Sequence, residues 1–228
     1  MKTTRSSIVV ASTFVAAALA ACGEAPAPRP PAPNVVPSSG VDVQATSPTA
    51  STPAAVAESN VDPSTWRVSS SADDAQLLEV AGFRAPKPAS WVWTKPSMQF
   101  RTLQYTVPGE GDSTKQAELI VSVFVAGDGG PLDANIDRWR GQFRQEGKPV
   151  EAIRSSKTVG PLKVELVELE GEFMAMGAPA PKANTLQLAA IVQAEGRNVF
   201  FRLVGPKETV EANRAAFDAM VEGLMPAD

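Results

Sequence analysis

The chain has 228 residues, a formal net charge of −4, no histidine and a single cysteine. A mildly acidic chain lacks the basic face that nucleic acid requires, so we expect no nucleic-acid partner. The chain has no histidine, and its one cysteine is expected to carry a lipid. It therefore lacks the usual ligands of zinc, copper and haem, and we expect no cofactor.

The N-terminus has the three parts of an export signal. Lys2 and Arg5 form a short basic region, and the apolar segment 8–19 that follows is too short to span a bilayer. It ends in Leu19-Ala20-Ala21-Cys22, which resembles the lipobox of bacterial lipoproteins. The resemblance implies that residues 1–21 are a signal peptide and that Cys22, the first residue after cleavage, receives a diacylglycerol on its thiol.

Lipidation of Cys22 would make the membrane the first partner of the chain. An N-terminal cysteine of this kind carries two or three acyl chains, and stable anchoring needs at least two. The alternative is an ordinary secretory signal that ends at a cysteine by chance. Cys22 has no second cysteine with which to form a disulfide, which favours the lipid. Gly23 is not aspartate, which favours the outer membrane in a Gram-negative host, so we expect a protein anchored in the cell envelope.

Residues 22–63 are predicted to form a disordered tether. This segment is dominated by proline, alanine, serine, threonine and valine, and it has no aromatic residue. Such a composition buries too little apolar surface to offset the entropy of ordering the chain. We therefore expect a partly extended tether that holds one globular domain, residues 64–228, away from the membrane.

The first part of the domain is predicted to be β-structure. The segment Phe83–Trp93 is broken by prolines and cannot be helical. Apolar residues alternate over Leu103–Val107, which predicts a strand. In Ala117–Val125 both alternate sets are apolar, which predicts a central strand covered on both faces.

A helix is predicted to begin at Pro131 and to end at Gly147. Its apolar stripe consists of Leu132, Ile136, Trp139 and Phe143, at spacings of four, three and four residues. Core packing is the expected role of Trp139, as it is of Trp91.

Four strands and a second helix are predicted to follow. The strands are 150–159, 162–169, 186–194 and 198–204, with a hairpin turn at Glu195-Gly196-Arg197. The alternation slips between Leu166 and Val167, which indicates a β-bulge. The helix begins after Gly205-Pro206 and is expected to stop at Pro226.

This order of elements predicts an α+β fold, with a central antiparallel sheet of about six to seven strands and helices packed on it. The pattern resembles the PsbP-like superfamily, which includes the Ran-binding Mog proteins. The resemblance covers about residues 66–226. Its marks are the segment Phe83-Arg84-Ala85-Pro86 before Trp91, the strand 117–125, the helix with Trp139 and Phe143, and the segment 199–206 before the last helix. It implies an α/β/α sandwich with binding or assembly roles and brings no catalytic residues.

Two groups of residues could support chemistry. Glu165, Glu168, Glu170 and Glu172 could form a cation site or an acid/base pair, although a solvated strand face is the favoured interpretation. Without histidine, the serines at 69–71 cannot form an ordinary Ser-His-Asp triad. A Ser–Lys pair, for example within Ser155-Ser156-Lys157, remains open.

The segment 173–181 is predicted to be a loop that contacts a partner. It is long for a hairpin connection and apolar where loops are normally polar, and Phe173, Met174 and Met176 are the expected contact residues. A loop that folds over the sheet edge is the alternative. The sequence thus favours a membrane-anchored, non-catalytic binding or assembly module for an envelope protein or small ligand. The alternative function is an envelope hydrolase that uses carboxylates or a Ser–Lys pair.

Overall fold

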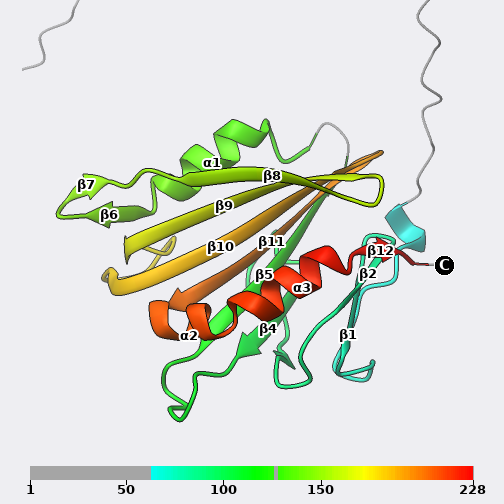
Figure 1. Cartoon of the computed structure of the whole chain (residues 1–228), viewed down its shortest axis with the longest axis horizontal. Helices are drawn as coiled ribbons and strands as arrows, with labels where there is room; N and C mark the ends of the chain where they lie inside the picture. The colour runs from blue at the N-terminus through cyan, green and yellow to red at the C-terminus, as the bar shows by residue number, and fades with distance from the viewer. Residues whose placement is uncertain (1–62, 126–127, 228) are drawn as a thin grey trace, which may run out of the picture. The chain divides into compact units, whose positions relative to one another are not determined.

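A computed structural model describes residues 63–125 and 128–227 of the chain (Figure 1). The predicted signal peptide, Cys22 and all but the last residue of the predicted tether lie outside the described residues. The first described element is a short 3-10 helix, η1, at Pro63–Thr65.

The largest element of the domain is a nine-stranded antiparallel sheet. Its strands, in spatial order, are β3 (Val92–Trp93), β4 (Leu103–Val107), β5 (Ala117–Val125), β11 (Arg197–Pro206), β10 (Lys182–Ala194), β9 (Leu162–Phe173), β6 (Phe143–Gln145) and β7 (Lys148–Pro149), while β8 (Ile153–Val159) also pairs with β9. The α+β class and the central antiparallel sheet are confirmed. The predicted number of strands is too low, because the short strands β3, β6 and β7 leave no alternating pattern in the sequence.

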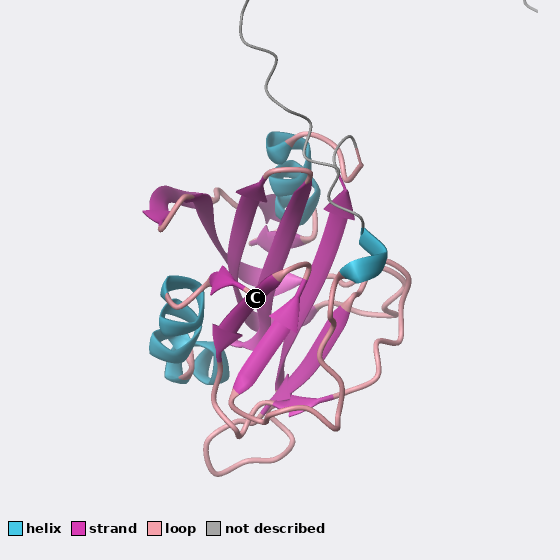
Figure 2. Cartoon of the chain, turned by 90° about the vertical axis from the view of Figure 1, so that its right-hand side faces the viewer, coloured by secondary structure: helices cyan, strands magenta, loops and turns pink. Residues whose placement is uncertain are grey.

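A second, three-stranded sheet and three α-helices complete the domain. The small sheet has the order β1 (Leu77–Val80), β2 (Phe83–Pro86) and β12 (Met225–Pro226). The helices are α1 (Leu132–Arg140), α2 (Lys207–Ala212) and α3 (Arg214–Glu222). Figure 2 shows helices on both sides of the large sheet, which gives the layered arrangement that the sequence predicts.

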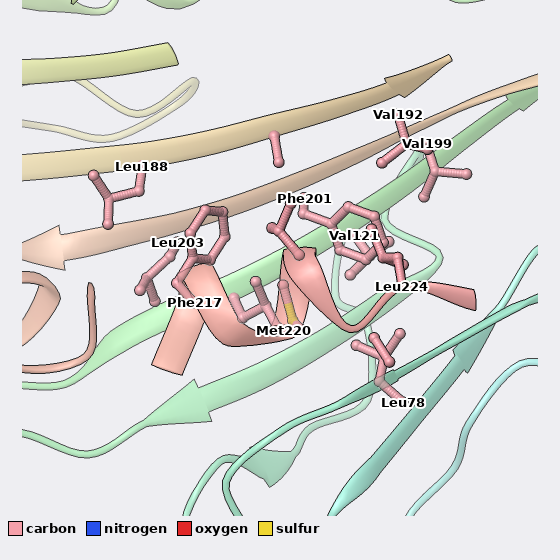
Figure 3. Close-up of a cluster of buried hydrophobic side chains, with 14 of the residues drawn as sticks. Leu78, Val121, Leu188, Val192, Val199, Phe201, Leu203, Phe217, Met220 and Leu224 are labelled. Atoms are coloured by element: carbon pink, nitrogen blue, oxygen red, sulfur yellow. The ribbon is translucent and has the colours of Figure 1, made fainter. Parts of the chain in front are cut away.

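One face of the large sheet packs against α2, α3 and the small sheet. Phe217, Met220 and Leu224 point from the α3 segment toward the strands (Figure 3). The sheet contributes Val121, Leu188, Val192, Val199, Phe201 and Leu203, and β1 contributes Leu78. Trp91 belongs to the same core and is 1% exposed, as predicted.

The opposite face packs against α1. Ile136 and Trp139 of the helix are buried against strand residues that include Ile120, Ala189 and Ile191. The rings of Trp139 and Phe200 meet edge to face, with centroids 5.7 Å apart. The core role of Trp139 is therefore confirmed, and β5, β10 and β11 are buried on both faces.

The predicted bulge between Leu166 and Val167 is wrong. β9 and β10 pair without a register shift from Lys163 opposite Gln193 to Glu170 opposite Leu186. The alternation slips because Val164 faces the α3 core whereas Val167 and Leu169 face the α1 core. The irregularity lies instead between Lys182 and Thr185, where Asn184 has a φ of +51°.

The predicted helix end at Gly147 is also wrong, since α1 ends at Arg140. Phe143 begins β6, where it pairs with Phe173 of β9 and still reaches the α1 core. Phe143 thus lies four residues after Trp139, as the next position of the apolar helix stripe would, although its backbone belongs to a strand. Glu146 and Gly147, with φ of +50° and +76°, form the tight turn of the β6–β7 hairpin.

The C-terminal helix is split in two at Asn213. The side chain of Asn213 donates to the carbonyl of Thr209 at 2.9 Å and accepts the indole N–H of Trp91 at 2.9 Å. The helical segment ends at Glu222, and Pro226, the predicted stop, lies in β12 beside β2. The hairpin between β10 and β11 is confirmed, with Glu195-Gly196 as its turn.

Candidate binding site

The predicted contact loop connects the two longest strands, β9 and β10. Met174 is 42% exposed and Met176 is 74% exposed, and none of the residues 174–181 is charged. Phe173 is different, because it ends β9 and its ring packs on Phe143 with centroids 4.9 Å apart. The backbone N–H of Met174 donates to the carbonyl of Gln142 at 2.8 Å, which fixes the start of the loop. Two of the three predicted contact residues are thus at the surface, and the third belongs to the α1 core.

Three of the four glutamates proposed as a cation or acid/base site form separate ion pairs with basic side chains. Glu165 lies 2.8 Å from Arg154, and Glu168 lies 2.8 Å from Arg214 at the start of α3. Glu170 lies 2.6 Å from Lys207 at the start of α2. These carboxylates attach neighbouring elements to β9. In residues 63–125 and 128–227, no group of three or more acidic or cysteine side chains is placed to hold a metal ion.

The Ser–Lys candidate on β8 is not assembled for catalysis. Lys157 pairs with Glu222 at 3.1 Å, and Ser155 and Ser156 are exposed on the strand. The serines at 69–71 lie near a different lysine, Lys87, which is 7% exposed.

Lys87 lines a hollow of about 170 Å³ together with Ser70, Ser71, Asp73, Asp74, Trp91, Trp93 and Tyr105. Its Nζ donates to the carbonyls of Ala75, Pro88 and Trp91. Burial lowers the pKa of Lys87, with a smaller opposing effect of Asp74. Three carbonyl acceptors nevertheless require a protonated amine that donates three hydrogens, so this Nζ is not placed to take a proton from a serine.

Ser70 is equally engaged. Its Oγ donates to Asp73 Oδ2 at 2.8 Å and accepts the N–H of Ala72 at 3.3 Å, as in a local turn. Another hollow, of about 200 Å³, lies beside α2, and its Lys115 and Glu208 neutralise each other at 2.6 Å. Neither hollow gathers the groups that a hydrolase of the Ser–Lys or paired-carboxylate type would need.

A distinct polar site lies on the α1 face of the large sheet, beside the part that the helix covers. Arg202 projects there from β11, with its guanidinium 5.0 Å from the ring centre of Trp139. Its Nε and Nη2 donate to Oε1 of Gln187 at 3.0 and 2.5 Å, and Nη2 lies 3.4 Å from Oε1 of Gln142. Both acceptors are neutral amides. No carboxylate in the described part of the chain forms an ion pair with Arg202.

Two more arginines lie on the same side of the sheet. Arg101 bonds Gln104, which pairs with Ile120 opposite Arg202, and Arg138 precedes Trp139 on α1. Burial and, to a smaller extent, the positive charges of Arg101 and Arg138 lower the pKa of Arg202 to about 9. Arg101 bonds Gln104 Oε1 at 2.9 Å and Glu118 Oε2 at 3.3 Å. Arg138, on α1, donates to Asn135 Oδ1 at 2.6 Å. Arg101, Arg138 and Arg202 are called the arginine cluster below.

An aromatic row extends across the same face toward the arginine cluster. Phe100 stacks on Phe124 with centroids 6.3 Å apart, and Phe124 contacts Phe200 at 5.1 Å. Phe100 is 68% exposed and has a φ of +68°, which is uncommon for a bulky residue. Such outliers gather at functional sites, and this one directly precedes Arg101.

Sequence reasoning did not identify the arginine cluster. The sequence contains one indication of the site, because Arg202 is a charged residue within the otherwise apolar segment Val199–Val204 of a central strand. Arg101 and Arg138 cannot be recognised in this way, because charged residues are common in a loop and on a helix surface. The fold brings the three together through the order β4-β5-β11 and the position of α1.

No protein-family model matches the sequence, and no curated protein matches it either. Similar solved structures include the cyanobacterial PsbP of Synechocystis sp. PCC 6803, with 12% identity and a TM-score of 0.45 over 70% of this chain and 98% of that one. LpqN, involved in cell envelope biogenesis of Mycobacterium tuberculosis, has 13% identity and a TM-score of 0.40 over 64% and 83%. Protein PA94 of Pseudomonas aeruginosa, of unknown function, has 11% identity and a TM-score of 0.41 over 67% and 96%.

The α+β class itself follows from the strands and helices described above. Among the described residues, no helix is long and apolar enough to cross a membrane.

Proposed function

We propose that this chain is a lipid-anchored protein of the bacterial cell envelope whose globular domain binds a protein partner without catalysing a reaction. The lipobox at Cys22 and the proline-rich segment that follows support the anchor and the tether. The observation that carries the binding role is the loop 174–181, an uncharged segment with two exposed methionines. Flexible, polarizable methionines suit adaptable protein contacts.

The hydrolase alternative has less support. Lys87 and Ser70 donate their hydrogens to carbonyl and carboxylate oxygens, Lys157 pairs with Glu222, and three of the four glutamates are in ion pairs. A binding role needs only the exposed surface of the loop, which connects two strands held in the centre of the sheet.

The test is to replace both methionines in the lipid-anchored protein, as Met174→Ser with Met176→Ser, and to crosslink intact cells. Ile153→Ser is the matched control, because Ile153 is 70% exposed on β8, outside the loop. We expect one crosslinked partner to be lost from the loop variant and kept by the control. The partner set of the loop variant would equal that of the control if the loop contacted nothing.

A further inference from the structure

Arg202 is a cation in a position where a folded protein normally places an apolar residue. Its neighbours on the same face of β11, Phe200 and Val204, are buried, and across the sheet it lies opposite Ala189 and Ile120. Arg202 is half-buried, and a charge withdrawn from water is costly unless a counterion accompanies it. The protein supplies only the amide oxygens of Gln187 and Gln142, so the charge of Arg202 is solvated but not neutralised.

The neighbouring charges increase this imbalance. Arg154 on β8, by comparison, lies 2.8 Å from both Asp133 and Glu165, so its charge is fully matched. In the arginine cluster, Glu118 is the one carboxylate bonded to an arginine, and it contacts Arg101. Three guanidinium groups and one carboxylate leave two positive charges without a partner among the described residues.

Hydrogen-bond donors are also unused at this place. Arg202 Nη1 donates to no acceptor in the described part of the chain, although its Nε and Nη2 are both engaged. Nε2 of Gln187 is buried and has no acceptor either, while its Oε1 holds Arg202. An unpaired buried amide is unusual, and a water molecule or a ligand would supply the missing acceptor.

We propose that the arginine cluster, with Gln187, binds a phosphate group. Phosphate carries about −1.5 to −2 charges near neutral pH, which matches the two unpaired positive charges. Its oxygens accept from guanidinium N–H groups, often from two at once. The group could belong to inorganic phosphate, a soluble phosphomonoester or the phosphodiester of a phospholipid headgroup, which carries one negative charge and would neutralise one of the two positive charges. This site is separate from the loop 174–181 and does not depend on the proposed function.

The test is calorimetric titration of the protein with inorganic phosphate, against sodium chloride of matched ionic strength. We expect saturable binding to the wild-type protein, and Arg202→Gln to weaken it about ten- to a hundredfold, as expected for loss of a charge-assisted hydrogen bond. Arg154→Gln is the matched control and should bind as the wild type does. Equal binding by Arg202→Gln would overturn the proposal, and so would absence of saturable binding of the wild type to inorganic phosphate, glycerol 3-phosphate and phosphatidylglycerol vesicles alike.

Two further arms separate the sources of the phosphate. One uses glycerol 3-phosphate, and the other uses phosphatidylcholine vesicles with and without phosphatidylglycerol. Binding that depends on Arg202 in the soluble arms identifies a free phosphate compound, and binding only to phosphatidylglycerol vesicles identifies a headgroup; both support the site. Failure in all arms contradicts it.

Should Arg202→Gln not fold, the Nε–H resonance of Arg202 in the wild type must shift with phosphate and stay unchanged with chloride. The variant with Met174→Ser and Met176→Ser should still bind phosphate, which keeps the two proposals distinguishable.

Discussion

At the scale of single residues, some polar side chains stabilise the domain by donating hydrogen bonds to backbone carbonyls in its interior. Lys87 is the clearest example, since its Nζ joins the carbonyls of Ala75, Pro88 and Trp91. The ring of Tyr105 lies 4.9 Å from the same Nζ, which adds a cation–π contact. The lysine therefore ties the segment before β1 to the segment before β3.

Replacement of this lysine should destabilise the fold. Lys87→Met keeps the aliphatic stem but leaves the three carbonyls without their donor, and we expect a loss of about 1–3 kcal/mol in the free energy of unfolding. Urea denaturation measures it. Lys163→Met is the control, because Lys163 is exposed on β9, and its effect should stay within about 0.5 kcal/mol. Equal stability of the two variants would contradict this role for Lys87.

At the scale of elements, the strands could be predicted well where one pattern dominates. The sequence predicts β5 because apolar residues occupy both alternate sets, and the structure buries both of its faces. Phe143 could not be placed, since its spacing fits the α1 stripe while its backbone belongs to β6. Glu146 and Gly147 form the turn that places Phe143 in a strand instead of a helix, and β6 also needs β9 as its pairing partner.

The ion pair between α2 and α3 should depend on pH. The hydrogen bond from Arg214 lowers the pKa of Glu211, and Arg214 also bonds Glu168 at 2.8 Å. A carboxylate whose pKa is lower in the folded state stabilises the fold above its unfolded pKa, and this contribution is lost as the pH falls through the folded value. The pair of Arg214 with Glu211 should therefore stabilise the protein at neutral pH and progressively less below the ordinary glutamate pKa of 4.5.

Arg214→Gln tests this expectation. The side chain is 34% exposed, so we expect a loss of only about 0.5–1 kcal/mol at pH 7. Thermal unfolding at pH 7 and pH 3 should show that the difference from the wild type shrinks in acid. Lys148→Gln, an exposed position on β7, should show no such pH dependence. A difference that stays constant with pH would contradict the ion-pair explanation.

At the scale of the whole molecule, the candidate site was harder to predict than the fold. The exposed part of the loop 174–181 followed from its composition, although Phe173 turned inward to Phe143. The arginine cluster could not be predicted, because Arg101, Arg138 and Arg202 are distant in sequence and meet only through the strand order and the position of α1. Local patterns report on neighbours along the chain, whereas this site is defined by neighbours across the sheet.

The anchor proposed at Cys22 gives the last prediction. Cys22 is the only cysteine, so no other thiol can carry a thioether-linked lipid. Metabolic labelling with an alkyne analogue of palmitate should mark the wild-type protein in its bacterial host and not Cys22→Ala. The purified domain of both proteins should unfold at the same temperature, because both cores consist of residues between Leu78 and Leu224. Label on the variant, or none on the wild type, would rule out lipidation at Cys22 and leave the ordinary secretory signal as the explanation of residues 1–21.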